Sequence, residues 1–337
     1  MLRLPCLLLS IVLAGSACAA PPPPASGLDA VLARWDQDEH PDLRAVVVMQ
    51  QGQVVAERYY NGATANELHD VRSAGKSVTA LLVGIARDQG RLQIDQPVQR
   101  YWKQAAGSAI GPVALRDVLS MRSGLAADDQ DSTSPGNEDR MDAAADPKAF
   151  VLTVPRAAPP GTAYTYNSLT SYVAGVVVTE ATGMAMDAFA RQYLFAPLGI
   201  QHWQWARDAS GITKGQGNLS LRARDFATLG ELVRNEGVYN GKRVVSAAWL
   251  RDALTPHVAI GDSDPYADGY GYYWYAKTHD INGTPVPVRF ASGNGGNKIY
   301  VVPSRQLVVA ITSSAYGKGY GQRRSEAILK ALLAATP

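Results

Sequence analysis

The chain contains almost no cysteine. Only Cys6 and Cys18 occur among its 337 residues, and both lie within the first twenty. If a leader is cleaved after Ala19 or Ala20, the mature chain has no cysteine, which excludes disulfides, thiolate chemistry and zinc held by cysteine. The five histidines form no metal-spaced pair such as H-x-x-x-H, so we expect neither a metal site nor a cofactor.

Long runs of like charge are also absent. The formal net charge is +2, and this balance argues against nucleic acid or a charged membrane surface as a partner. Hydrophobic residues make up 46% and charged residues 18% of the chain. This composition is typical of a globular protein with a sizeable core, and the length allows one large domain or two closely packed subdomains.

Only the N-terminus carries a long apolar run. "MLRLPCLLLSIVLAGSACAA" has one basic residue, Arg3, an apolar run from Leu7 to Leu13 and then small residues. This pattern predicts a signal peptide over residues 1–19, because the run is too short to span a bilayer. We therefore expect a periplasmic or secreted bacterial protein with no transmembrane span after signal removal. The alternative is a lipoprotein anchored through Cys18, although Gly15 stands where the usual motif has leucine.

Hydrophobic periodicity predicts strands at both ends of the chain and helices in the middle. Residues 20–27, which include "PPPPAS", predict a linker, and residues 28–337 a single domain whose central, mostly helical lobe covers approximately 92–256. The absence of βαβ alternation argues against a parallel sheet. We expect a mixed α and β fold, in which N- and C-terminal strands form one antiparallel sheet flanked by helices. The polar segment 128–140 has no apolar face and is expected to be a loop.

The segment "DVRSAGKSVTALLVGIARDQG", residues 70–90, holds a serine and a lysine three positions apart at the start of a predicted helix. Ser73 and Lys76 share a helix face, so the amine can reach the hydroxyl. The residues after Lys76 are almost wholly apolar, which predicts a buried helix from about Ser73 to Asp88. Partial burial would lower the pKa of the lysine and make it a competent base. The simpler interpretation is a helix cap with a surface lysine, since S-x-x-K also occurs by chance.

With motifs further along the chain, this pair resembles the serine β-lactamase and penicillin-binding-protein superfamily, in particular its class C-like branch. That branch includes β-lactamases, D-Ala-D-Ala peptidases, β-lactamase-fold esterases and 6-aminohexanoate-dimer hydrolases. The resemblance covers roughly Leu43 to Leu333, with the motifs in the family's order, and it implies a β-lactamase-like fold. The motifs are Ser73-Ala74-Gly75-Lys76, "LRDVLSMRSGL", Tyr166-Asn167-Ser168 and "SGNGGNKIYVVP".

The resemblance also implies roles for individual residues. Ser73 would attack a carbonyl and form an acyl-enzyme, with Lys76 and Tyr166 sharing the general acid–base work. The backbone N–H groups of Ser73 and Asn297 would form the oxyanion hole. Ser168, in place of the family's asparagine, would hydrogen-bond Lys76 or the substrate. The residues expected along the substrate are Asn294, Gly295 and Gly296, although "GNGGN" in isolation is more often a turn.

One departure from the family bears on the substrate. β-Lactamases and peptidases carry a cation in the third motif, where this chain has the neutral Asn294. We therefore expect an exported serine hydrolase that cleaves a small ester or amide. The alternatives are a β-lactamase or D-Ala-D-Ala carboxypeptidase acting on a β-lactam or peptide, a penicillin-binding sensor that acylates without turnover, and a scaffold that binds a ligand without chemistry.

Overall fold

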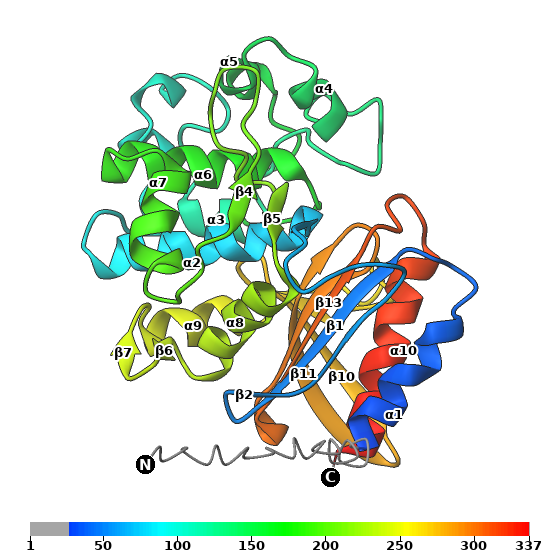
Figure 1. Cartoon of the computed structure of the whole chain (residues 1–337). Coiled ribbons are helices and arrows are strands. Elements are labelled where there is room, and N and C mark those ends of the chain that lie inside the picture. Colours follow the sequence, from blue (N-terminus) through cyan, green and yellow to red (C-terminus); the bar gives the residue numbers. More distant parts are fainter. Residues whose placement is uncertain (1–26, 337) are drawn as a thin grey trace, which may run out of the picture.

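An eight-stranded antiparallel sheet forms the centre of the fold (Figure 1). The computed structural model describes residues 27–336, so the expected signal peptide and all of the expected linker except Gly27 lie outside the described residues. The strand order is β2-β1-β13-β12-β11-β10-β9-β8, which places the first two strands beside the last ones. The strands are β1 (Leu43–Gln50), β2 (Gln53–Tyr59), β8 (Val258–Ala259), β9 (Gly269–Tyr270), β10 (Tyr275–Ile281), β11 (Thr284–Gly293), β12 (Asn297–Val302) and β13 (Leu307–Ser313).

Helices cover both faces of this sheet. On one face α1 (Gly27–Ala33) packs beside the long C-terminal helix α10 (Tyr320–Ala335), as Figure 1 shows. On the other face α8 (Ala223–Arg234) lies against β1, β12 and β13. Gly230 permits this close approach, because a Cβ atom there would lie 2.5 Å from side-chain carbons of Ile299 and Val308.

The remaining helices form a lobe beside the sheet (Figure 1). Its centre is the pair α2 (Gly75–Asp88) and α6 (Ser168–Thr182), which pack on each other and are buried along most of their length. Around them lie α3 (Leu115–Leu119), α4 (Glu138–Asp142), α5 (Pro147–Thr153), α7 (Met186–Ala190) with a following π-helical turn (Arg191–Phe195), and α9 (Ala247–Leu254). Short strands complete the fold: β3 (His69–Asp70), β4 (Trp203–Trp205) and β5 (Leu219–Leu221) pair in one sheet, and β6 (Val238–Tyr239) with β7 (Lys242–Arg243) in another.

The fold class predicted from the sequence is confirmed, and several local expectations are refined. The helix expected from Ser73 begins at Gly75, and Ser73 lies in a 3-10 turn, η2 (Arg72–Ala74). Helix α8 falls inside the range 92–256 that was predicted as a helical lobe, but it packs on the sheet. The segment 128–140 is not wholly a loop, since α4 begins at Glu138.

None of the helices among the described residues would by itself be long and apolar enough to cross a membrane. Helix α6 and the segment Met186–Phe195 reach the required length and composition only as a pair bent by 74°.

Candidate active site

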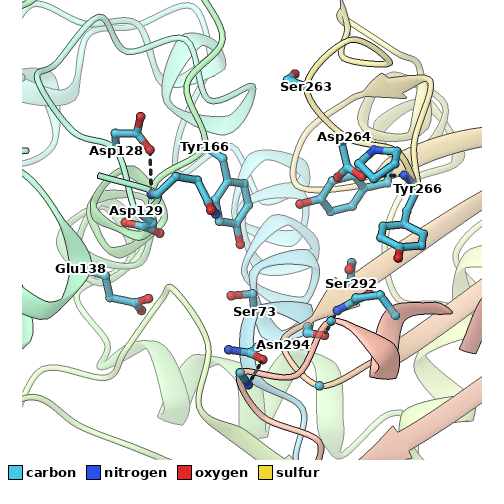
Figure 2. A pocket seen from close by; sticks show the side chains of 18 of the residues that line it. Ser73, Asp128, Asp129, Glu138, Tyr166, Ser263, Asp264, Tyr266, Ser292 and Asn294 are labelled. Carbon is cyan, nitrogen blue, oxygen red and sulfur yellow. Dashed lines mark hydrogen bonds between the residues drawn. The ribbon is translucent and has the colours of Figure 1, made fainter. Parts of the chain in front are cut away.

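A pocket of about 870 Å³ opens between the sheet and the helical lobe, and Ser73 lines it (Figure 2). One wall comes from the helical-lobe side and carries Asp128, Asp129 and Glu138. The opposite wall comes from β11 and the loops around it, where Figure 2 shows Asp264 and Ser292. Tyr166 lies between the two walls, close to Ser73.

The backbone that presents Ser73 is strained. Arg72, the residue before it, has a φ of 52°, a left-handed conformation that costs a non-glycine residue about 1 kcal/mol. Two contacts hold Arg72 there: its N–H donates to Asp70 Oδ1 at 2.8 Å, and its guanidinium lies 4.1 Å from the ring centre of Tyr316. A Cβ atom at Gly217 would lie 2.6 Å from the Arg72 carbonyl oxygen, so only glycine fits beside this turn.

Lys76 lies beneath Ser73 and is almost completely buried, with 2% of its surface exposed. Its Nζ donates to Ser73 Oγ at 2.9 Å, to Ser168 Oγ at 3.0 Å and to the carbonyl oxygen of Gln216 at 2.9 Å. These three acceptors match the three N–H donors of an ammonium group. The amine thus reaches Ser73 as the i, i+3 spacing predicts, but the surface-lysine interpretation is wrong.

The direction of the Lys76 pKa shift differs from the sequence prediction. Burial acts to lower the pKa of Lys76, but the Tyr166 oxygen and the carboxylates of Glu138 and Asp129 outweigh it, so the pKa lies above its ordinary value. The prediction of a lowered pKa was wrong because it considered burial alone, without the anionic neighbours that the fold supplies. Lys76 is therefore an ammonium at neutral pH.

The second motif, Tyr166-Asn167-Ser168, joins the pocket to the start of α6. The Asn167 side chain caps this helix by accepting from the Thr170 N–H at 2.8 Å. The cap places Tyr166 before the helix, where its ring centre lies 5.1 Å from Lys76 Nζ. Ser168 is fully buried and does not line the pocket. Of the two contacts predicted for Ser168, the structure therefore contains the one to Lys76.

The third motif is a tight turn between β11 and β12. Gly293 ends β11, and the Gly296 N–H donates back to its carbonyl oxygen at 3.2 Å. Gly295 has a φ of 85°, which a side chain would strain. Strand β11 packs against η2 at this point, because a Cβ atom on Gly293 would lie 2.0 Å from the Val71 carbonyl oxygen. The turn interpretation of "GNGGN" is confirmed, and the turn stands directly beside Ser73.

This turn changes the predicted assignments of two residues. Asn294 and Gly295 line the pocket, but Gly296 and Asn297 do not. Gly296 packs on α10, where its carbonyl oxygen accepts from Ser325 Oγ at 2.6 Å. Asn297 is fully buried, and its side chain bonds the Asn294 and Ser313 carbonyl oxygens. The structure therefore places only Asn294 and Gly295 of this motif at the pocket, whereas the resemblance implied roles for Gly296 and Asn297 as well.

Two backbone N–H groups are free at the pocket. Within residues 27–336, the N–H groups of Ser73 and Asn294 donate to no protein acceptor. Both residues line the pocket. They lie close together because β11 packs tightly against η2 at Gly293. Unpaired N–H groups beside a hydroxyl can bind an oxygen that gains negative charge. The Asn294 side chain is otherwise engaged, since its Oδ1 accepts from the Gly317 N–H at 2.7 Å.

The sequence analysis missed the acidic wall. Both carboxylate oxygens of Asp129 are inaccessible to solvent, and Ser168 is the group placed to donate to this carboxylate. Burial, reinforced by Glu138 and opposed by Lys76, raises the pKa of Asp129 to about 6. The acidic segment "DDQDS" was visible in the sequence, but no local pattern indicated that it folds over Lys76. The described residues contain no group of three or more His, Cys, Asp or Glu side chains placed to hold a metal ion.

Comparison with known proteins finds relatives in sequence and structures of similar fold. A 6-aminohexanoate-dimer hydrolase from Paenarthrobacter ureafaciens is 29% identical over 258 residues, which are 70% of this chain and 64% of the relative. The chain thus spans slightly less than two thirds of that protein. A penicillin-binding protein homologue from Caulobacter crescentus superposes with a TM-score of 0.74 at 20% identity, covering 92% of this chain and 96% of the other. A family VIII carboxylesterase gives a TM-score of 0.72 at 16% identity, covering 90% and 96%.

The chain has the fold that β-lactamases and penicillin-binding proteins share. The chain belongs to the Beta-lactamase family, which it matches over residues 35–333.

Proposed function

We propose that the protein is a serine hydrolase that cleaves a small ester or amide through an acyl-enzyme on Ser73. The observation that carries this proposal is the contact of 2.9 Å between Lys76 Nζ and Ser73 Oγ at the pocket. A buried ammonium bonded to a half-exposed hydroxyl has little structural benefit, because burying a charge is costly. It does make the hydroxyl more acidic and therefore a better nucleophile.

In this mechanism the Ser73 oxygen attacks the substrate carbonyl, and its proton passes to the coupled pair Lys76 and Tyr166. Lys76 Nζ lies 5.1 Å from the centre of the Tyr166 ring, so the two groups act as one proton-transfer pair. The pair then returns the proton to the leaving alcohol or amine as the tetrahedral intermediate collapses to the acyl-enzyme. Water completes the cycle by attacking the acyl-enzyme, and its proton follows the same route to Ser73.

The oxyanion of the intermediate is assigned to the N–H groups of Ser73 and Asn294. This replaces the assignment of Asn297, since Asn294 lines the pocket and Asn297 does not. Donors that are already fixed before the reaction stabilise developing charge without reorganisation.

An activity panel tests the proposal. The purified protein is incubated with p-nitrophenyl butyrate, the linear 6-aminohexanoate dimer, a chromogenic cephalosporin and a D-Ala-D-Ala peptide, and turnover and intact mass are followed. We expect turnover of the ester or the linear amide. Fastest turnover of the cephalosporin or the peptide would instead indicate a β-lactamase or carboxypeptidase. A stable adduct without turnover would indicate a sensor, and neither turnover nor adduct would contradict the enzyme proposal.

Gly293→Ala is expected to lower kcat/KM without unfolding the protein. The added Cβ atom would meet the Val71 carbonyl oxygen at 2.0 Å, so β11 must move away from η2 and carry the Asn294 N–H with it. A displacement of about 1 Å at a reacting centre costs about 100-fold in rate. Gly261→Ala is the matched control, because the nearest atom to its added Cβ lies 3.9 Å away. Unchanged kcat/KM in Gly293→Ala would show that this contact does not position the site.

We also propose that the protein is exported to the periplasm or the medium. The alternative is that it is anchored to a lipid through Cys18. It is supported by the apolar run and small residues of segment 1–19. The intact mass of the protein recovered from the periplasm distinguishes these forms, and a full-length mass in the cytoplasm would contradict both.

A further inference from the structure

Gln322 lines the pocket from the first turn of α10, and it has no role in the mechanism above. Its Nε2 donates to the carbonyl oxygen of Gly293, the last residue of β11, at 2.9 Å. Its Oε1 is inaccessible to solvent and accepts no hydrogen bond among the described residues. Turning the amide over would set Oε1 against the Gly293 oxygen, acceptor against acceptor, so the network fixes Nε2 on this side. The function of Gln322 therefore lies in its donor.

The Gly293 carbonyl and the Asn294 N–H belong to the same peptide unit. A trans peptide is planar, and its C=O and N–H point in opposite directions. A donor that holds the Gly293 oxygen thus also fixes the direction of the Asn294 N–H. This N–H is one of the two free donors at the pocket, and Figure 2 labels both residues that carry them, Ser73 and Asn294. Donation to the carbonyl also polarises the peptide, which strengthens its N–H as a donor by about 10–30%.

The turn that contains this peptide has few other constraints on its orientation. The Gly296 N–H also donates to the Gly293 oxygen, but at 3.2 Å, which is the long end of the usual range. Glycines stand on both sides of Asn294, at 293 and 295, and glycine has more backbone freedom than any other residue. Without the Gln322 donor, one long hydrogen bond would remain on the carbonyl, and the peptide could rotate.

Helix α10 contacts this turn at a second carbonyl, which provides an internal comparison. Ser325 lies three residues after Gln322, on the same helix face, and its Oγ donates to the Gly296 carbonyl oxygen at 2.6 Å. That carbonyl shares its peptide with the Asn297 N–H, and Asn297 does not line the pocket. Both side chains anchor the turn to α10, but only Gln322 holds the peptide whose N–H serves the pocket.

We infer that Gln322 is a positioning residue of the oxyanion site, which donates from α10 to the Gly293 carbonyl oxygen and thereby aims the Asn294 N–H at the oxyanion. This inference deepens the proposed function and rests on it. It gives a role in the reaction to α10, a helix that supplies no reacting group.

Gln322→Met removes the donor and keeps a side chain of similar length. The loss of a whole oxyanion donor costs about 100- to 1,000-fold in kcat, and a donor turned out of line should cost part of that. We therefore expect kcat/KM to fall about 10- to 100-fold for the substrate that the unaltered protein cleaves fastest in the activity panel. An unchanged kcat/KM would overturn the inference.

Gln322→Glu tests whether the donor itself matters. At neutral pH the new carboxylate only accepts, so the loss should be at least as large as in Gln322→Met. Once protonated, the carboxyl regains one O–H donor in nearly the same shape. A glutamate ordinarily has a pKa of about 4.3, and a neighbouring carbonyl oxygen raises it. Relative to the unaltered protein, kcat/KM of Gln322→Glu should therefore rise from about pH 7.5 to about pH 5, while that of Gln322→Met stays low. The absence of this rescue would contradict the role of the donor.

Trifluoroacetophenone probes the oxyanion site without turnover. Ser73 Oγ bonds its carbonyl carbon, the π electron pair becomes the oxyanion, and the Ser73 proton passes to Lys76 and Tyr166. No group leaves, so the inhibition constant reports the stability of the tetrahedral adduct. In Gln322→Met this constant should rise by about the factor by which kcat/KM falls. An unchanged constant beside a lowered kcat/KM would show that Gln322 acts elsewhere.

Two controls separate orientation of the peptide from general anchoring. Gln50→Met removes a glutamine whose Nε2 donates to the Arg305 carbonyl oxygen at 3.4 Å, outside the pocket, and should leave kcat/KM unchanged. Ser325→Ala should lower the melting temperature more than it lowers kcat/KM. A loss of kcat/KM in Ser325→Ala as large as in Gln322→Met would show that the turn needs anchoring only, and would overturn the inference.

Thermal unfolding of every variant reports whether the fold is kept, and Gln322→Met carries the comparison if Gln322→Glu does not fold. Failure of the proposed function is distinguishable from failure of this inference. The first would appear in the unaltered protein, as the absence of turnover and adduct. The second would appear as an active unaltered protein whose Gln322 variants keep its rates.

Discussion

Ser73→Ala is expected to abolish turnover of whichever ester or amide the protein cleaves, with a loss in kcat of about 10,000-fold or more. The hydroxyl is the only part of the side chain that is removed, and it is the atom that would carry the acyl group. The fold should survive, since Ser73 is half-exposed and Lys76 keeps its contacts to Ser168 and Gln216.

Initial rates and intact mass after incubation with an activated ester measure this effect. The variant should show neither turnover nor an adduct, while its thermal unfolding stays close to that of the unaltered protein. Ser108→Ala is the matched control, because Ser108 is a partly buried serine whose hydroxyl donates to the Ala105 carbonyl oxygen, and it does not line the pocket. A Ser73→Ala variant with the original rate would show that the nucleophile is assigned wrongly.

Lys76→Met is expected to lower kcat/KM by about 100- to 10,000-fold, the range typical of a lost acid–base group. Methionine fills a similar volume without charge, so Ser73 loses its activating donor and Tyr166 loses the cation 5.1 Å from its ring centre. The effect on stability is smaller. Leaving the Gln216 carbonyl oxygen unpaired costs about 1–3 kcal/mol, and removing a buried charge offsets part of that cost.

A double-mutant cycle with Tyr166→Phe makes this prediction specific. If Lys76 and Tyr166 act as one proton-transfer pair, the double variant should be little worse than the more damaged single variant. Lys148→Met is the control, since Lys148 pairs with Glu180 outside the pocket. Fully additive losses would contradict the coupled mechanism, and an unimpaired Lys76→Met would remove Lys76 from it.

Local patterns in the sequence were sufficient to predict how Ser73 and Lys76 lie relative to each other. The i, i+3 spacing predicted the contact between Lys76 and Ser73, and the apolar helix that follows predicted the burial of Lys76. The structure shows both. The resemblance added Tyr166, which no local pattern joins to Ser73 across 92 intervening residues. The resemblance placed Tyr166 just before a helix, and α6 begins at Ser168 after the Asn167 cap.

The parts that could not be predicted depend on contacts distant in sequence. The third acceptor of Lys76 is the backbone carbonyl of Gln216, 140 residues away, and a backbone oxygen has no signature in the sequence. The predicted direction of the Lys76 pKa shift was wrong for the same reason, since only the folded chain brings Asp129 and Glu138 close to this amine. The roles implied for Gly296 and Asn297 depended on how the turn after Gly293 is placed, and the close approach of Gly293 to Val71 at this turn is a tertiary contact.

The sheet order has a consequence for the order in which the protein can fold. Strand β1 pairs with β2 on one edge and with β13 on the other, so that Val46 stands opposite Ile311. During synthesis the β1–β2 hairpin therefore waits, with one edge unpaired, until nearly the whole chain has emerged. An unpaired edge is prone to aggregation, and such long-range pairing is slow to form. Because β11, which flanks Ser73, belongs to the same late group of strands, the residues near the nucleophile are made early but its pocket is completed last.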